Sequence, residues 1–151
     1  MRIVTQNALN ASVTIDEKVV AKIDKGLLLL VSFTLGDDEE IIDKMINKLL
    51  SLRIFPDENG KTNLSLKDVD ASLLSVSQFT LYASVKDGRR PSFTNCLSGE
   101  KASQLYDYFN EKLIYSGVKL EKGVFGEDMK VSFINDGPFT LILDSKELFN
   151  R

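Results

Sequence analysis

The run GLLLLVSF, residues 26–33, constrains the fold of this chain more than any other segment. It is far shorter than the roughly 18–20 apolar residues that a membrane-spanning helix needs. An apolar run without alternating polar residues is typical of a central strand that is buried on both faces. We therefore predict a sheet with this strand near its middle.

Two other segments have a helical period. In residues 35–52 the apolar side chains recur as one face of a helix, and Asp37 with Glu40 resembles a capping box. In residues 98–117, Ser98 can cap the start of a helix and Gly117 can end it. The two apolar faces consist of Ile41, Ile42, Met45, Ile46, Leu49 and Leu50 in the first segment, and Ala102, Leu105, Phe109 and Leu113 in the second.

Short strands account for most of the remaining chain. No linker, repeat or low-complexity segment interrupts the sequence, so we predict one domain over residues 1–151. Its fold class is α/β with α+β character, in which mixed β-sheets carry two amphipathic helices packed on one face. The strands are expected at residues 2–8, 11–15, 18–23, 53–55, 72–83, 118–121, 129–135 and 139–143.

Composition excludes several kinds of chemistry. The chain has no histidine and one cysteine, Cys96, which excludes Ser-His-Asp and Cys-His nucleophile systems and the usual zinc sites. A net charge of −3 argues against nucleic-acid binding through bulk charge, although a local basic patch is compatible with it. The N-terminal residues begin a strand pattern without the layout of a signal peptide, which predicts a cytoplasmic protein.

Three stretches contain candidate site residues. In SVSQFTLY, residues 75–82, Gln78 and Thr80 would present an amide and a hydroxyl on one face of a strand, but an ordinary half-exposed strand explains this stretch better when it is taken alone. In KDGRRPSF, residues 86–93, a loop holds three cations that suit phosphate or are simply solvated. In VFGEDM, residues 124–129, we interpret the two adjacent carboxylates as turn residues and not as an acid–base pair.

The stretch NDGPFTLILD, residues 135–144, places Gly137 and Pro138 directly before a strand. Glycine is the residue with the greatest backbone freedom and proline the one with the least. A turn is one explanation of such a pair, and a functional loop is the other.

In combination these stretches resemble D-aminoacyl-tRNA deacylases. The resemblance rests on SQFT, GRRPSF, FGEDM and NDGP in that order, together with ASVTID, GLLLLV and LRIFPDENGKTNLSL, and it covers essentially the whole chain. One departure is clear, because the family usually carries Gln-Arg-Val where this chain has Gln6-Asn7-Ala8.

The resemblance implies a three-layer fold and a homodimer with active sites at the subunit interface. Family members hydrolyse the ester between a D-amino acid and the 3′ end of tRNA, without a metal or an organic cofactor. It also implies that the peptide bond between Gly137 and Pro138 is cis, and that the loop carrying these residues reaches into the partner's pocket beside Thr80. The backbone of the loop would there bind the α-ammonium group of the substrate and exclude L side chains. Glycyl-tRNA would then be hydrolysed as well, since glycine has no side chain to exclude.

The residues implied for each role are as follows. Backbone N–H groups near Phe79 and Thr80 stabilise the oxyanion, Gln78 orients the terminal adenosine, and Ser77 braces the strand. Thr80 is a weak candidate nucleophile, since no base stands beside it in sequence. Substrate binding is assigned to Gly137, Pro138, Asn135, Phe139 and Met129, and tRNA binding to Lys86, Arg89 and Arg90.

Two functions are compatible with these residues. The first is an ester hydrolase acting on aminoacyl-tRNA, which the combined motifs favour. The second is a non-catalytic, dimeric module that binds RNA or a nucleotide, which the lack of a conventional catalytic group favours. Both predict a local RNA contact and no membrane segment.

Overall fold

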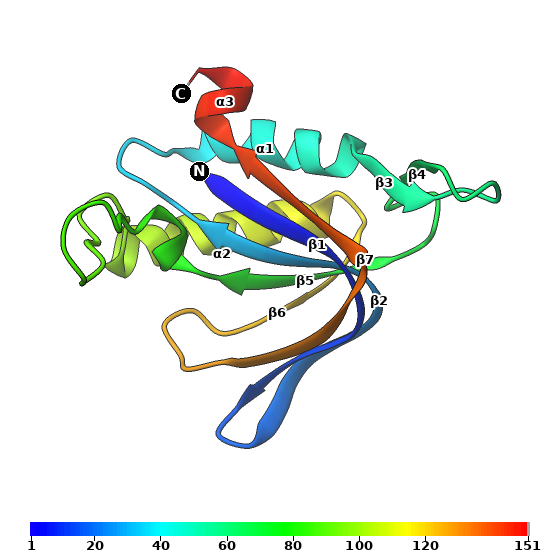
Figure 1. Cartoon of the computed structure of the whole chain (residues 1–151), viewed down its shortest axis with the longest axis horizontal. Coiled ribbons are helices and arrows are strands. Elements are labelled where there is room, and N and C mark those ends of the chain that lie inside the picture. The colour runs from blue at the N-terminus through cyan, green and yellow to red at the C-terminus, as the bar shows by residue number, and fades with distance from the viewer. Residues whose placement is uncertain (151) are drawn as a thin grey trace.

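A five-stranded sheet forms the centre of the protein, which a computed structural model describes over residues 1–150. Its strand order is β6-β5-β2-β1-β7, with β2 antiparallel to β1 and parallel to β5 (Figure 1). The apolar run at 26–33 falls mainly in β2, so the predicted central strand is confirmed. The five strands are β1 (Arg2–Ile15), β2 (Lys18–Ser32), β5 (Ser72–Ser77), β6 (Lys119–Lys122) and β7 (Lys130–Asp144).

Two long helices cover one face of this sheet, as predicted. The helices α1 (Glu39–Ser51) and α2 (Gly99–Tyr115) pack against each other and against the strands (Figure 1). A short helix, α3 (Ser145–Phe149), follows β7, and β3 (Arg53–Pro56) pairs with β4 (Thr62–Ser65) as a separate hairpin. Within residues 1–150, no helix combines the length and apolar character needed to cross a membrane.

The central strand is buried on both faces because two hydrophobic cores meet it. Leu27 and Leu29 belong to the core beneath the helices, whereas Leu28 belongs to a second core on the opposite face. The long strands β1, β2 and β7 bend (Figure 1). The end of β1 and the beginnings of β2 and β7 thereby fold over the second core and enclose it. Gly26 permits the close approach of β2 to β5, because a Cβ there would lie 1.7 Å from the carbonyl oxygen of Ser72.

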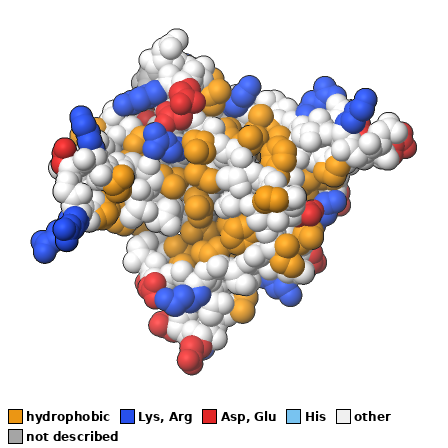
Figure 2. Space-filling view, viewed as in Figure 1, with side chains coloured by type: hydrophobic (Ala, Val, Ile, Leu, Met, Phe, Trp, Pro, Cys, Tyr) orange, Lys and Arg blue, Asp and Glu red, His pale blue; other side chains and the backbone are white. Residues whose placement is uncertain are grey.

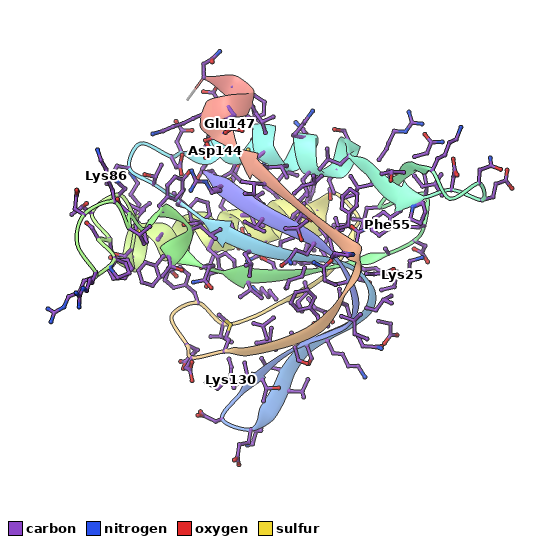
Figure 3. The ribbon with its side chains drawn as sticks, in the orientation of Figure 1. Lys25, Phe55, Lys86, Lys130, Asp144 and Glu147 are labelled. Carbon is purple, nitrogen blue, oxygen red and sulfur yellow. The ribbon has the colours of Figure 1, made fainter. Side chains whose placement is uncertain are left out.

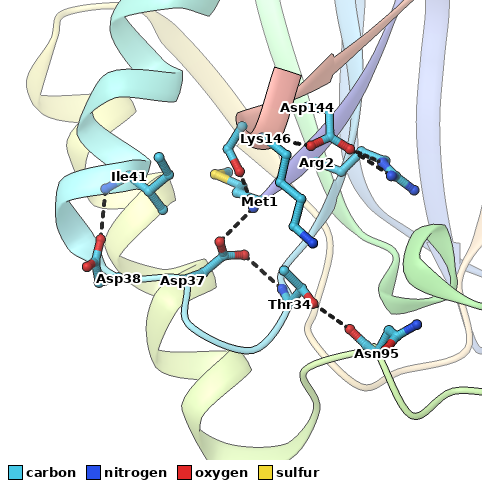
Figure 4. A network of polar contacts seen from close by, with 10 residues as sticks. Met1, Arg2, Thr34, Asp37, Asp38, Ile41, Asn95, Asp144 and Lys146 are labelled. Carbon is cyan, nitrogen blue, oxygen red and sulfur yellow. Dashed lines mark hydrogen bonds and ion pairs between the residues drawn. The ribbon is translucent and has the colours of Figure 1, made fainter. Parts of the chain in front are cut away.

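The predicted helix faces are confirmed, but the first cap is shifted by one residue. Asp38, and not Asp37, caps α1, since its side chain accepts a hydrogen bond from the N–H of Ile41 at 3.0 Å. Asp37 instead accepts from the N–H of Thr34 and from the α-ammonium group of Met1, at 2.8 and 2.7 Å (Figure 4). Asp37 therefore connects the start of β1 to the loop that follows β2.

Several predicted strands are longer than expected. Residues 2–8 and 11–15 form one strand, and so do residues 18–23 and most of 26–33. Likewise 129–135 and 139–143 merge into β7. In β1 and β2, pairing with each other carries the strands past the polar positions that broke the sequence pattern, because backbone hydrogen bonding does not depend on side-chain type.

Candidate active site

A cavity of about 360 Å³ lies at the carboxyl end of β5. Three segments that are distant in sequence line it: residues 76–79 at the end of β5, residues 98–99 at the start of α2, and residues 125–129 between β6 and β7. The carboxyl end of a strand is a common position for a ligand site in sheets with parallel strands. This cavity is therefore the candidate active site.

The predicted strand over residues 72–83 is wrong beyond Ser77. Gln78 makes the last ladder bond, from its N–H to the carbonyl oxygen of Val31 at 2.8 Å, and Phe79–Tyr82 then forms a 3-10 turn. The strand that pairs with β5 is β2, and it ends at Ser32. The residues that follow Gln78 therefore have no strand on that side to pair with. They bond locally instead, and the N–H of Ala83 donates to the carbonyl oxygen of Thr80 at 3.0 Å.

This 3-10 turn has consequences for the chemistry of the cavity. The opening N–H groups of a helical turn have no carbonyl partner inside the turn, so those of Phe79 and Thr80 suit a developing negative charge. Ser32 holds the turn from below, because its hydroxyl donates to the carbonyl oxygen of Phe79 at 3.1 Å. Gln78 Nε2 donates to Thr80 Oγ1 at 2.5 Å, so the predicted neighbourhood of amide and hydroxyl exists, although a turn and not a strand creates it.

Arg2 fixes the far end of the same turn. Its Nη1 donates to the carbonyl oxygen of Leu81 at 2.6 Å. Its Nε donates to Asp144 Oδ2 at 2.8 Å, as Figure 4 shows. The guanidinium group also lies 4.6 Å from the centre of the Tyr82 ring. Burial would raise the pKa of Asp144, but the hydrogen bonds from Arg2 and the N–H of Lys146 outweigh it and lower that pKa.

The rear of the cavity is supported by α2. The hydroxyl of Tyr106 donates to the carbonyl oxygen of Ser75 at 2.9 Å, and its ring centre lies 5.9 Å from that of Phe125. Burial raises the pKa of Tyr106, so this hydroxyl keeps its proton and its donor role at neutral pH. The buried face of α2 thus packs behind the end of β5 and Phe125 and stabilises this part of the cavity wall.

Gly137 and Pro138 lie on a protrusion of β7, away from this cavity. The β1–β7 register passes from Ala8↔Asn135 to Gln6↔Thr140, so residues 136–139 loop out of the ladder. Asn135 closes the loop: its Oδ1 accepts from the N–H of Phe139 at 2.9 Å, and its Nδ2 donates to Thr140 Oγ1 at 3.0 Å. Gly137 and Pro138 are exposed at its tip, and the peptide bond between them is cis.

Comparisons with known proteins identify the family. The family model described as D-Tyr-tRNA(Tyr) deacylase matches residues 4–144. The chain belongs to this family. Proteins named D-aminoacyl-tRNA deacylase are 52% identical to it, over 100% of both chains in Listeria monocytogenes and over 95% of this chain and 99% of the other in Lactobacillus delbrueckii.

Solved structures have the same fold. One, titled c-Myc DNA Unwinding Element Binding Protein, has a TM-score of 0.89 and 35% identity, covering 95% of this chain and 98% of that chain. Another, described as a probable eukaryotic D-amino acid tRNA deacylase, has a TM-score of 0.84 over 94% and 97% of the two chains. At 19% identity, this second likeness concerns the fold alone.

The cavity of this deacylase-family chain unites some predicted site residues and not others. Ser77, Gln78, Phe79 and Met129 line it, and Thr80 is exposed directly after Phe79. Asn135, Gly137, Pro138 and Phe139 are not among the residues that line it. Lys86, Arg89 and Arg90 are exposed on the loop after the 3-10 turn, and Figure 3 shows Lys86 at the edge of the molecule.

Asn7 occupies the position where the resemblance described above predicts an arginine. It is buried, and its Nδ2 donates to the carbonyl oxygen of Ile54 at 3.0 Å, toward β3. The neighbouring Gln6 does reach the loop region, because its Nε2 donates to Thr140 Oγ1 at 3.2 Å. In this chain, therefore, amide groups brace the base of the loop.

Sequence reasoning missed part of the cavity lining. The helix α2 begins at Gly99, directly after Ser98, as predicted, but the Ser98 side chain makes no capping hydrogen bond. Nothing in the sequence of these two residues indicated that they face a cavity. Glu127 and Asp128 lie in an irregular segment, as interpreted, yet they line the cavity together with Phe125. The motif FGEDM was the available signal for that segment. Within residues 1–150, no group of three or more His, Cys, Asp or Glu side chains could hold a metal ion.

Proposed function

We propose that this protein hydrolyses the ester bond of D-aminoacyl-tRNA, which releases the D-amino acid and clears mischarged tRNA in the cytoplasm. One observation carries the proposal: residues 76–79 and 125–129, which hold two of the motifs of the family, line a single cavity. The relatives with 52% identity over the full length are named for this activity. Residues 1–151 would act as one deacylase domain.

The 3-10 turn would supply the main catalytic effect. In this mechanism the N–H groups of Phe79 and Thr80 bind the ester carbonyl oxygen as water attacks its carbon. The bond from that carbon to the 3′ oxygen of the terminal adenosine then breaks, and this oxygen takes up the proton that the attacking water has released. The neighbouring 2′-OH assists the attacking water. One such oxyanion donor is typically worth roughly 10²–10³ in rate.

The side chains near the turn would orient the substrate. Gln78 would orient the terminal adenosine, Met129 would contact the substrate in the cavity, and Ser77 would brace the end of β5. Thr80 is not the nucleophile in this proposal, because its Oγ1 accepts from the Gln78 amide, a group that cannot remove its proton.

A homodimer would complete the site. Gly137 and Pro138 are exposed and lie outside the lining of their own cavity, so they are available to enter the partner's cavity beside Thr80. Exposed apolar side chains, among them Ile134 and Ile142 on β7, offer a surface for such pairing, and Figure 2 shows apolar side chains gathered over β1 and β7. Asn135 and Phe139 would shape the loop.

Chiral selection would follow from this loop. Its backbone would bind the α-ammonium group of the substrate and occupy the space that an L side chain needs. Glycine esters would be hydrolysed too, because glycine presents hydrogen at both positions. The cations Lys86, Arg89 and Arg90 would bind tRNA phosphates locally, despite the net negative charge of the chain.

The test is a comparison of D-tyrosyl-tRNA, L-tyrosyl-tRNA and glycyl-tRNA, with release of free amino acid as the readout. We expect rapid hydrolysis of the D and glycyl esters and little hydrolysis of the L ester. Light scattering on the same preparation should give twice the mass of the chain. Equal rates on D and L esters would contradict chiral selection, and an active monomer would contradict the shared site.

A non-catalytic nucleic-acid-binding module is the second candidate. The observation that favours it is the structure titled c-Myc DNA Unwinding Element Binding Protein, which is 35% identical over 95% of this chain. Binding of tRNA without release of amino acid from any of the three esters would support this candidate against the first.

A further inference from the structure

Two phenylalanine rings are exposed side by side at the edge of the candidate site. Phe79 and Phe93 are 45% and 47% exposed, and their ring centres lie 5.4 Å apart with a 53° angle between the planes. Phe79 also lines the cavity, whereas Phe93 comes from the loop that follows the 3-10 turn. The ring pair therefore extends the apolar surface of the cavity outward to this loop.

The loop that carries Phe93 is anchored at its base. Ser84 and Ser92 exchange two backbone hydrogen bonds of 2.8 Å, which close residues 85–91 into a hairpin-like loop. Further along, Thr34 Oγ1 donates to the carbonyl oxygen of Asn95 at 2.7 Å (Figure 4). Because both sides are tied, the Phe93 ring has a defined position beside Phe79.

The same loop holds the cations at its tip. Lys86, Arg89 and Arg90 are exposed there with one opposing carboxylate, Asp87, so the loop is positive on a chain of net charge −3. Exposed aromatic rings next to exposed cations are the combination that binds single-stranded nucleic acid, in which bases stack on rings and phosphates contact cations.

We propose that Phe93, whose ring packs at a tilt against Phe79, binds the base of the unpaired nucleotide that precedes the terminal adenosine of the tRNA. This inference rests on the proposed function, because it assumes that the terminal adenosine and its ester occupy the cavity. The chain of the RNA then leaves the cavity past Phe79, meets the Phe93 ring next, and reaches the cations with its following phosphates. The loop thereby recognises RNA by its unpaired end and not by its sequence.

The experiment compares two substrates that differ in this nucleotide. D-tyrosyl-tRNA carries it, whereas the 3′-D-tyrosyl ester of adenosine lacks it. Phe93→Ala removes the ring on which the base would stack. It should therefore lower kcat/KM on D-tyrosyl-tRNA roughly 5- to 100-fold, mainly by raising KM. The fall on the adenosine ester should be at least five times smaller. Phe93→Tyr keeps a ring and should restore activity on the tRNA.

Val85→Ala is the matched control. Val85 lies on the same loop and is 76% exposed, so this change also removes an exposed apolar side chain, but not a ring. We expect it to change neither substrate's kcat/KM by more than about twofold. Direct binding gives a readout without catalysis: Phe93→Ala should weaken the binding of a short single-stranded RNA ending in adenosine at least fivefold.

Three results would overturn the inference. If Phe93→Ala lowered kcat/KM equally on both substrates, Phe93 would stabilise the cavity as a whole and would not bind the preceding nucleotide. Loss of the dimer in Phe93→Ala, seen by light scattering, would assign the ring to contact between two copies of the chain. Unchanged binding of the short RNA would remove the stacking role. A wild-type protein that hydrolyses neither ester contradicts the proposed function instead, and the binding measurement then still decides the role of Phe93.

Discussion

Arg2 holds Leu81 by its backbone, with Nη1 donating to the carbonyl oxygen at 2.6 Å. This hydrogen bond joins the start of the first strand directly to the turn 79–82. The other nitrogens of the same guanidinium group bind Asp144 Oδ2, at 2.8 Å from Nε and 2.7 Å from Nη2. One side chain thus ties the 3-10 turn of the candidate site to the ends of β1 and β7.

Replacing Arg2 should therefore affect catalysis more than substrate affinity. We expect Arg2→Lys to lower kcat about tenfold with a smaller change in KM, because an ammonium group cannot hold Leu81 and Asp144 with the planar fork of a guanidinium. Steady-state hydrolysis of D-tyrosyl-tRNA measures both constants. Lys44→Met, which breaks an exposed pair with Glu40, should change neither, and equal effects of the two variants would contradict the prediction.

The pH dependence of stability should report on Asp144. Its pKa is lower in the folded protein than the value of about 3.9 in an unfolded chain, since the bonds from Arg2 and Lys146 outweigh burial. The stabilisation is thus fully present above that unfolded value and is lost as the pH falls through the lower, folded pKa. Urea unfolding of wild type and Asp144→Asn should show a smaller difference in unfolding free energy at pH 3 than at pH 6. A constant difference would contradict this.

Thr80 should be dispensable as a nucleophile. Its hydroxyl accepts a hydrogen bond from Gln78, so no base is positioned to activate it through that contact. We expect Thr80→Val to keep measurable deacylation, within about 100-fold of wild type, and Thr80→Ser to remain closer. Single-turnover release of D-tyrosine is the measurement. Complete loss in Thr80→Val with tRNA binding intact, or a trapped acyl-enzyme, would indicate a covalent mechanism.

Removing two cations from the loop should change how tRNA binding depends on salt. In the double variant Arg89→Ala with Arg90→Ala, the slope of log affinity against log salt should fall by roughly 1.5, since each phosphate contact adds about 0.7–0.9. Binding titrations at salt concentrations from about 50 to about 200 mM measure the slope. Lys44→Ala with Lys48→Ala removes the same charge from α1 and should leave the slope unchanged.

The position of Gly137 should control chiral selection. Its φ is +140°, and a Cβ there would lie 2.9 Å from the backbone nitrogen of Phe139, so Gly137→Ala must move the loop. We expect slower hydrolysis of D-tyrosyl-tRNA and a smaller ratio of D to L rates. Gly60→Ala is the matched control, because Gly60 has a φ of +75° but nothing within 4 Å of the added atom. An unchanged D to L ratio in Gly137→Ala would separate the loop from selection.

The sequence by itself determined the central strand and the two helices. The unbroken apolar run at 26–33 and the helical period around Ile41 and Phe109 reflect local backbone geometry, which side-chain spacing encodes directly. It also singled out Ser77, Gln78, Phe79 and Met129, which the structure brings together in one cavity. The shift of the first cap from Asp37 to Asp38 is the kind of one-residue error expected at helix ends.

Only the tertiary structure decided where β5 ends and what surrounds it. The sequence of residues 72–83 predicts a strand throughout, yet β2 ends at Ser32, and the chain beyond Gln78 turns because it has no neighbouring strand there. Ser98 and Gly99, at the start of α2, line the cavity because the helix packs on the sheet in a position that only tertiary contacts determine. Periodicity records which face of an element is buried, whereas its termination and its neighbours depend on strands and helices that are distant in sequence.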